Sequence, residues 1–242
     1  MTRPLPRYET NGHAVTHVNG HALSQTTATA HALRPGEMPP EGVAVSATLA
    51  EPITGAAPRV DLQAAQRAAA DFLRALGIDL DGEDLRDTPA RLTRAYAELL
   101  TARPPRLTTF PNDEGYDELV LIRAIPFRTV CEHHLLPFSG VAHVAYLPGE
   151  RVLGLSKLAR LVEFLAARPQ TQERLTRQLA DYLATHLSAR WAGAMLEAEH
   201  TCMTLRGVRA QGTKTVTTAL AGPLRANPQH RAEFLALTGA PS

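Results

Sequence analysis

The chain has 242 residues, of which 44% are hydrophobic, and a formal net charge of +1 at pH 7. That length permits one or two domains with a sizeable core, and a net charge so near zero excludes a bulk field that would attract nucleic acid or an acidic membrane. No apolar run approaches the roughly 20 residues that span a bilayer, and the N-terminus lacks the apolar stretch of a secretory signal, so we expect a cytoplasmic protein without membrane or nucleic-acid partners.

Residues 1–57 differ in composition from the rest of the chain. They are rich in Ala, Thr, Pro, Gly and His and show no sustained helical or strand period. Such a segment buries too little apolar surface to offset its chain entropy. We therefore predict a disordered tail over residues 1–57 and a folded domain over residues 58–242.

Two helices are predicted within residues 61–102. Asp61 is a helix-capping residue before a periodic apolar stretch that ends at Gly77. Thr88 followed by Pro89 is typical of a second helix start.

Residues 115–242 alternate strand-like and helix-like segments. We expect strands at 118–125 and 141–147, a turn into a short run at 152–154, helices from Ser156 and from Pro169, a hairpin of strands 193–203 and 213–220, and a closing helix capped by Asn227. This order predicts an α+β fold with a largely antiparallel sheet.

The only two cysteines, Cys131 and Cys202, each have a histidine two residues away. Two cysteines are too few for a disulfide scaffold, and these neighbours favour a reducing compartment with metal or catalytic use. A single disulfide or two buried thiols is the alternative.

Cys131 and His134 are three residues apart, so one helical turn points them the same way and leaves His133 off the metal. His200 and Cys202 would share one face of a strand. Three protein ligands leave a position for water, as in catalytic zinc sites, whereas His200 as a fourth ligand would make the site structural. The residues alone leave both possibilities open.

Charged side chains elsewhere also allow two interpretations. Ser156 lies at a predicted helix N-terminus, a position that favours phosphate. Arg91 and Arg94 lie on one side of the second helix, where a solvated basic face is the simpler interpretation. Glu173 could pair with Arg177 four residues further on, as an ordinary surface ion pair.

Five motifs taken together resemble the GTP cyclohydrolase I family, from about Asp61 to the C-terminus. They are Asp87-Thr88-Pro89-Ala90-Arg91, the run CEHHLLPF at 131–138, GLSKLAR at 154–160, QERL at 172–175, and EHTCM at 199–203 with Arg206-Gly207. The resemblance implies the tunnelling fold (T-fold), an antiparallel sheet with helices packed on one side and subunit sheets closing into a barrel. It further implies a homodecamer of two pentamers with active sites between subunits.

The implied activity is the zinc-dependent hydrolysis of GTP at C8, a hydrolase reaction on cyclic amidine C–N bonds. Water opens the ring, formate leaves, and the remainder rearranges to 7,8-dihydroneopterin triphosphate, the first step of tetrahydrofolate and pterin biosynthesis. A catalytically idle zinc-binding scaffold or regulatory homologue is the alternative.

The resemblance also implies residue roles. One zinc per subunit is held by Cys131, His134 and Cys202. His133 donates a proton to N7, and His200 assists later proton transfers; a purely orienting role for His133 is the alternative. Guanine recognition falls to Glu173, and the triphosphate contacts are Ser156, Lys157, Arg160, Arg206, Arg91 and Arg94.

Overall fold

The computed structural model describes residues 60–101, 105 and 108–239; the predicted tail over residues 1–57 lies outside them. The elements follow the chain in this order: α1 (Leu62–Ala75), α2 (Thr88–Leu99), β1 (Thr109–Pro111), β2 (Val120–Cys131), β3 (Pro137–Leu147), β4 (Arg151–Leu153), α3 (Leu155–Ala166), β5 (Pro169–Gln170), α4 (Gln172–His186), β6 (Trp191–His200), α5 (Thr201–Thr204), β7 (Thr215–Ala221) and α6 (Pro228–Thr238). No helix among these is long and apolar enough to cross a membrane.

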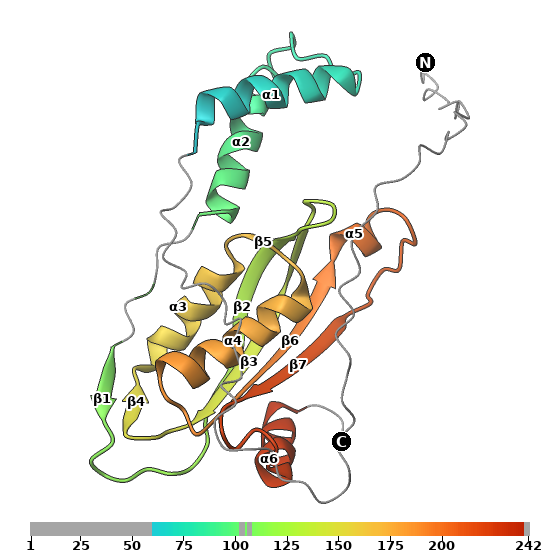
Figure 1. Cartoon of the computed structure of the whole chain (residues 1–242). Coiled ribbons are helices and arrows are strands. Elements are labelled where there is room, and N and C mark those ends of the chain that lie inside the picture. The colour runs from blue at the N-terminus through green and yellow to red at the C-terminus, as the bar shows by residue number, and fades with distance from the viewer. Residues whose placement is uncertain (1–59, 102–104, 106–107, 240–242) are drawn as a thin grey trace, which may run out of the picture. The chain divides into compact units, whose positions relative to one another are not determined.

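A five-stranded sheet in the order β5-β2-β3-β6-β7 forms the centre of the fold (Figure 1). Every neighbouring pair is antiparallel except β2 with β5, which run parallel over two residue pairs. The predicted α+β class with a largely antiparallel sheet is therefore confirmed, as is the predicted hairpin of β6 and β7.

The pairing of β4 differs from the prediction. The sequence predicts a turn from strand 141–147 into a short run at 152–154, but Arg151–Leu153 does not continue the main sheet and pairs with β1 in a separate two-stranded sheet. Arg151 supports that pairing, since its Nε and Nη2 donate to the hydroxyl and the carbonyl of Thr109. Thr109 of β1 lies 42 positions before Arg151, so local turn chemistry could not reveal the pairing.

Strands β3 and β6 pair along ten residues, from Phe138 opposite His200 to Leu147 opposite Trp191. The two strands approach closely at Gly140, where an added Cβ would lie 1.9 Å from the carbonyl oxygen of Glu197. Glycine is needed there because any side chain would push the strands apart.

Helices cover both faces of the sheet, to different extents. Helices α3 and α4 lie side by side over one face (Figure 1). On the other face, Phe234 of α6 packs against Ala145, Leu147 and Trp191 at one end of the strands. The expectation of helices on one side only is therefore wrong for this chain.

Local capping explains most helix boundaries. The Asp61 side chain accepts from the amide of Ala64, and Asn227 accepts from Gln229, both as predicted. The N-cap of α2 is Asp87 rather than Thr88. Helix α4 begins after Thr171, whose hydroxyl accepts from Arg174, and not at Pro169, which belongs to β5.

The apolar side of α1 stays open to solvent. Leu73 is buried, but Leu62, Phe72 and Leu76 are exposed by 44%, 59% and 56%. A helix normally buries such a stripe against another element. Within the described residues α1 packs mainly on α2, and these three apolar side chains stay exposed.

Candidate metal centre and active site

Three potential metal ligands meet at one end of the sheet. The ligating atoms of Cys131, His134 and Cys202 all lie within 4.8 Å of one another. They come from the end of β2, the turn after it, and α5. Two thiols and an imidazole are a donor set that suits zinc, and three protein ligands leave one tetrahedral position for water. These residues fit the metal that the sequence predicts.

A tight turn presents His134. The amides of His134 and Leu135 both donate to the carbonyl of Cys131, at 3.3 and 2.7 Å. Leu135 has φ of 52°, in the left-handed region, and its carbonyl accepts from the Tyr96 hydroxyl of α2 at 2.9 Å. Hydrogen bonds within the turn and one from Tyr96 of α2 therefore stabilise the position of His134.

Cys202 reaches the cluster in a way the sequence did not reveal. We expected His200 and Cys202 on one strand, but β6 ends at His200 and Cys202 lies in the short helix α5. The Thr201 hydroxyl donates to the carbonyl of Pro137 at 2.5 Å, which ties the start of α5 to the start of β3.

The environment of Cys202 favours its thiol form in the metal-free protein. Burial raises the pKa of the Cys202 thiol, and so does the neighbouring Cys131. The guanidinium of Arg206 partly opposes this rise in pKa, which shows that Arg206 lies near the cluster. Metal binding must therefore displace a proton at Cys202.

His133 lies beside the cluster without belonging to it. Its Nδ1 lies 3.6 Å from the sulfur of Cys131, and its Nε2 lies 4.0 Å from a carboxylate oxygen of Glu132. The side chain is 65% exposed, so the ring is open to an incoming molecule.

His200 is more enclosed. Its ring stacks on Phe138 with the centroids 4.2 Å apart and the planes 11° from parallel. Its Nε2 lies 2.8 Å from Oε1 of Gln172. Burial lowers the pKa of His200, and the charge of Glu173 partly opposes this change. His200 is not one of the three clustered ligands in the described structure.

Sequence reasoning missed Gln172. This buried glutamine is the first residue of α4, and four of its hydrogen-bonding partners lie on β6 and β7 or just beside them. A polar residue at a core-facing helical position was the available signal.

Glu173 lines a cavity between α4 and β7. The cavity has a volume of about 450 Å³, and its other lining residues are Thr176, Arg177, Thr217, Thr218, Ala219 and Leu220. Arg177 forms its ion pair with Asp181 at 2.7 Å. Among the described residues no basic side chain pairs with Glu173, so the simple surface-pair interpretation does not hold.

The predicted phosphate contacts fall into separate groups. Arg206 lies near Cys202, whereas Ser156, Lys157 and Arg160 lie in the first turns of α3. The Leu153 amide, just before α3, donates to the Tyr146 hydroxyl at 2.8 Å. Tyr146 is nine residues along β3 from Pro137, which corresponds to about 30 Å. The start of α3 therefore lies toward the opposite end of β3 from the cysteine cluster.

Arg91 and Arg94 lie on α2. The Nη2 of Arg91 donates to the Asp84 carbonyl at 2.8 Å and to the Thr88 hydroxyl at 3.0 Å. Arg91 thus stabilises the loop before α2 through these hydrogen bonds.

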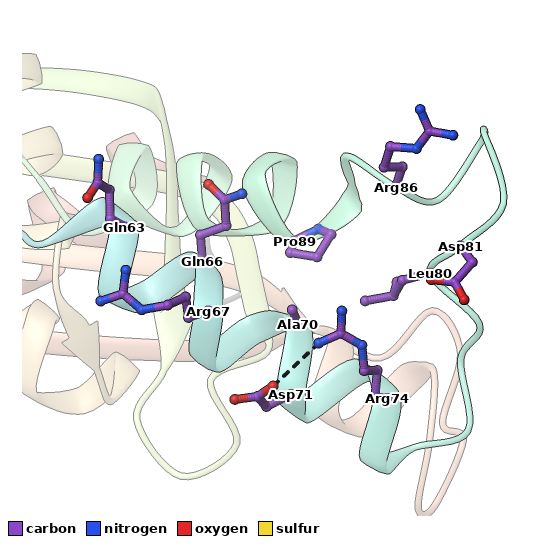
Figure 2. A pocket seen from close by; sticks show the side chains of 10 residues that line it. All are labelled: Gln63, Gln66, Arg67, Ala70, Asp71, Arg74, Leu80, Asp81, Arg86 and Pro89. Atoms are coloured by element: carbon purple, nitrogen blue, oxygen red, sulfur yellow. Dashed lines mark hydrogen bonds and ion pairs between the residues drawn. The ribbon is translucent and has the colours of Figure 1, made fainter.

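A larger cavity lies elsewhere, between α1 and the loop before α2 (Figure 2). It measures about 840 Å³ and is lined by mixed charges, including an exposed pair of Arg74 and Asp71 at 3.4 Å. It contains no cysteine or histidine, so its size does not make it the better candidate for catalysis.

Comparison with known proteins agrees with the site. The GTP cyclohydrolase I family profile matches residues 65–239. The chain is 47% identical over 181 residues to a protein named GTP cyclohydrolase 1 from Rhodopirellula baltica, covering 74% of this chain and 79% of that one. Proteins of the same name are 50% identical over 182 residues in Mycobacterium ulcerans (73% and 90% covered) and 46% identical over 183 residues in Thermoanaerobacter pseudethanolicus (74% and 97%). The chain belongs to the GTP cyclohydrolase I family.

Proposed function

We propose that this protein hydrolyses GTP at C8, releases formate and forms 7,8-dihydroneopterin triphosphate. The observation that carries the proposal is the convergence of Cys131, His134 and Cys202 beside two further histidines, in a chain that belongs to this family. A zinc ion held by these three residues would supply a Lewis acid that activates water near neutral pH.

Proton transfer is assigned to the two histidines. Attack on C8 requires a proton at N7 of the guanine, because the neutral aromatic ring is a poor electrophile. The exposed ring of His133 is accessible to supply that proton. The enclosed His200 would serve the later proton transfers of ring opening and rearrangement.

Guanine selection is assigned to Glu173. A carboxylate accepts from N1–H and the 2-amino group together, a pair of donors that adenine lacks. The absence of a basic partner for Glu173 within the described chain supports this role. A paired polar contact of this kind discriminates strongly, because the wrong base leaves buried groups unpaired.

We further propose that each active site combines residues of two subunits. Ser156 and Lys157 lie at the start of α3, toward the opposite end of β3 from the cysteine cluster of the same chain, which supports a site shared between copies. A neighbouring copy would supply those phosphate contacts, while Arg206 acts from the metal side. Arg91 and Arg94 would approach the triphosphate from α2.

Unpaired edges support such an assembly. Within the described residues β7 pairs only with β6, and the first part of β2 pairs only with β3. Edge strands with free N–H and C=O groups pair readily with another chain. Together with the exposed apolar side of α1, they support association with further copies of the chain, for which the family resemblance implies a closed barrel and a decamer of two pentamers. A cytoplasmic location and a place in tetrahydrofolate or pterin synthesis remain predictions.

The decisive assay uses purified, zinc-loaded protein with GTP. We expect equimolar formate and a pterin that fluoresces after oxidation. Full zinc occupancy without turnover would instead identify a zinc-binding scaffold. Arrest at a formamide would show incomplete catalysis.

A complementation experiment tests the shared site. His133→Ala and Lys157→Ala each disable a different half, so each variant alone should be inactive. Co-expression should restore activity, because some mixed interfaces join two intact halves. Failure of mixed assemblies to regain activity would mean that one chain builds the whole site.

A further inference from the structure

Gln172 is a buried side chain whose amide contacts two strands. It is 2% exposed. Its Nε2 lies 3.1 Å from the carbonyl oxygen of Leu196, 2.9 Å from that of Thr215 and 3.1 Å from the hydroxyl of Thr217. Its Oε1 faces Nε2 of His200 at 2.8 Å.

The surrounding groups allow only one orientation of this amide. Main-chain carbonyls accept hydrogen bonds and cannot donate, so the NH₂ group must face Leu196 and Thr215. The opposite orientation would bring the amide oxygen against two carbonyl oxygens and leave buried groups without hydrogen bonds, which is unfavourable.

The threonine hydroxyls fit the same orientation. The Thr176 hydroxyl donates to the carbonyl of Gln172 at 2.7 Å. The Thr217 hydroxyl lies 2.6 Å from that of Thr176 and must be the donor there, since the Thr176 hydrogen is already used. Thr217 therefore meets the Gln172 NH₂ group as an acceptor.

The orientation of the Gln172 amide determines which ring nitrogen of His200 carries a hydrogen. Because the amide oxygen of Gln172 only accepts, Nε2 of His200 must carry a hydrogen in both the neutral and the charged ring. In the neutral ring, Nδ1 is then the nitrogen without a hydrogen. Stacking on Phe138 holds the plane of the ring.

We propose that Gln172 is a positioning residue that fixes the neutral His200 ring as its Nε2–H form, which leaves the lone pair of Nδ1 free. The kinetic consequence rests on the proposed function, whereas the tautomer itself does not. Gln172 acts on the reaction only through His200.

Solid-state ¹⁵N NMR of zinc-loaded, ¹⁵N-histidine-labelled protein tests the tautomer without turnover, at a pH above the usual histidine pKa of about 6.5. The difference spectrum against His200→Asn isolates the signals of His200. Wild-type protein should show a protonated Nε2 and a bare Nδ1. Gln172→Met, which keeps the side-chain length but has no acceptor for this bond, should show a mixture of both tautomers.

Thr217→Val is the matched control. It removes one partner of the amide but leaves the two carbonyls that orient it, so the His200 spectrum should be unchanged. Zinc content and assembly size should match wild type in every variant compared. We expect kcat for Gln172→Met to fall by about 10- to 100-fold with little change in KM, as for other residues that orient a functional histidine.

A bare Nε2 in wild-type protein would overturn the proposal, and so would an unchanged tautomer in Gln172→Met. Absence of GTP turnover in wild-type protein would count against the proposed function, while the spectra would still decide the role of Gln172.

Discussion

Arg177 and Asp181 form an ion pair one turn apart on α4, with Nε of the arginine 2.7 Å from Oδ2 of the aspartate. Arg177 could equally have paired with Glu173, which lies one turn in the other direction. Because Arg177 pairs with Asp181, the Glu173 carboxylate has no ion-pair partner from this arginine and lines a cavity beside β7. An unneutralised carboxylate at the start of a helix, near a histidine, is suited to binding a donor pair on a ligand.

Replacing Glu173 with glutamine should therefore impair recognition of guanine. The amide keeps the size of the side chain but presents a donor to one of the two guanine donors. We expect kcat/KM for GTP to fall by about 100-fold or more. Steady-state kinetics at matched zinc content measures the effect, and Glu163→Gln at an exposed position of α3 is the control. Near wild-type kcat/KM in Glu173→Gln would rule out the guanine contact.

His133 and His134 should respond differently to truncation. Only His134 belongs to the three-ligand cluster, so His134→Ala should lose zinc. His133→Ala should retain zinc and lose activity, since it removes a proton donor but no ligand. Metal analysis beside the formate assay separates the two effects. Loss of zinc from His133→Ala would show that the ligand assignment is wrong.

Arg174 should strengthen metal binding without contacting the metal. Its Nε donates to the side chain of Gln170 at 2.9 Å, and its Nη2 donates to the carboxylate of Glu132, the residue after Cys131. Arg174→Met keeps much of the aliphatic stem but releases the turn that presents His134. We expect zinc to bind about tenfold more weakly, measured by competition with a chromophoric chelator.

Arg177→Met is the control for this prediction, because it removes an arginine from the same helix whose ion pair lies away from the turn. Equal zinc affinity in Arg174→Met and wild type would mean that the turn is rigid without the arginine.

His143 should make the protein sensitive to acid. Burial lowers its pKa, Arg123 lowers it further, and Glu197 partly opposes both. Because the folded protein favours the neutral ring, the unfolded chain takes up a proton first as the pH falls below about 6.5. Stability is then complete above that pH and declines below it.

Urea unfolding near pH 7.5 and near pH 5.5, at one protein concentration, measures this decline. His143→Phe has a ring of similar shape that cannot titrate, so its midpoint should fall less than that of wild type. Equal declines in the two proteins would remove His143 as a cause.

Features that depend on neighbouring residues could be predicted from the sequence. Asp61 and Asn227 cap their helices through side-chain bonds within three residues. Cys131 and His134 share a turn that their spacing predicts. Patterns of this range need no knowledge of the rest of the fold.

Features that depend on distant partners could not be predicted in this way. Cys202 leaves the strand because Thr201 bonds to Pro137, 64 residues earlier. Gln172 gains its role only when α4 packs on β6 and β7, whose bonding residues lie 24 to 45 positions away. Likewise, the length of β3 separates the motif at 131–138 from the motif at 154–160, although the two are close in sequence.

The length of β3 has a consequence for how activity responds to the amount of protein. If the two ends of that strand serve different active sites, an isolated chain contains two incomplete halves. Specific activity should then fall on dilution, with a midpoint that reports subunit dissociation rather than substrate affinity. A cell could therefore adjust pterin output through the supply of subunits alone, by the law of mass action.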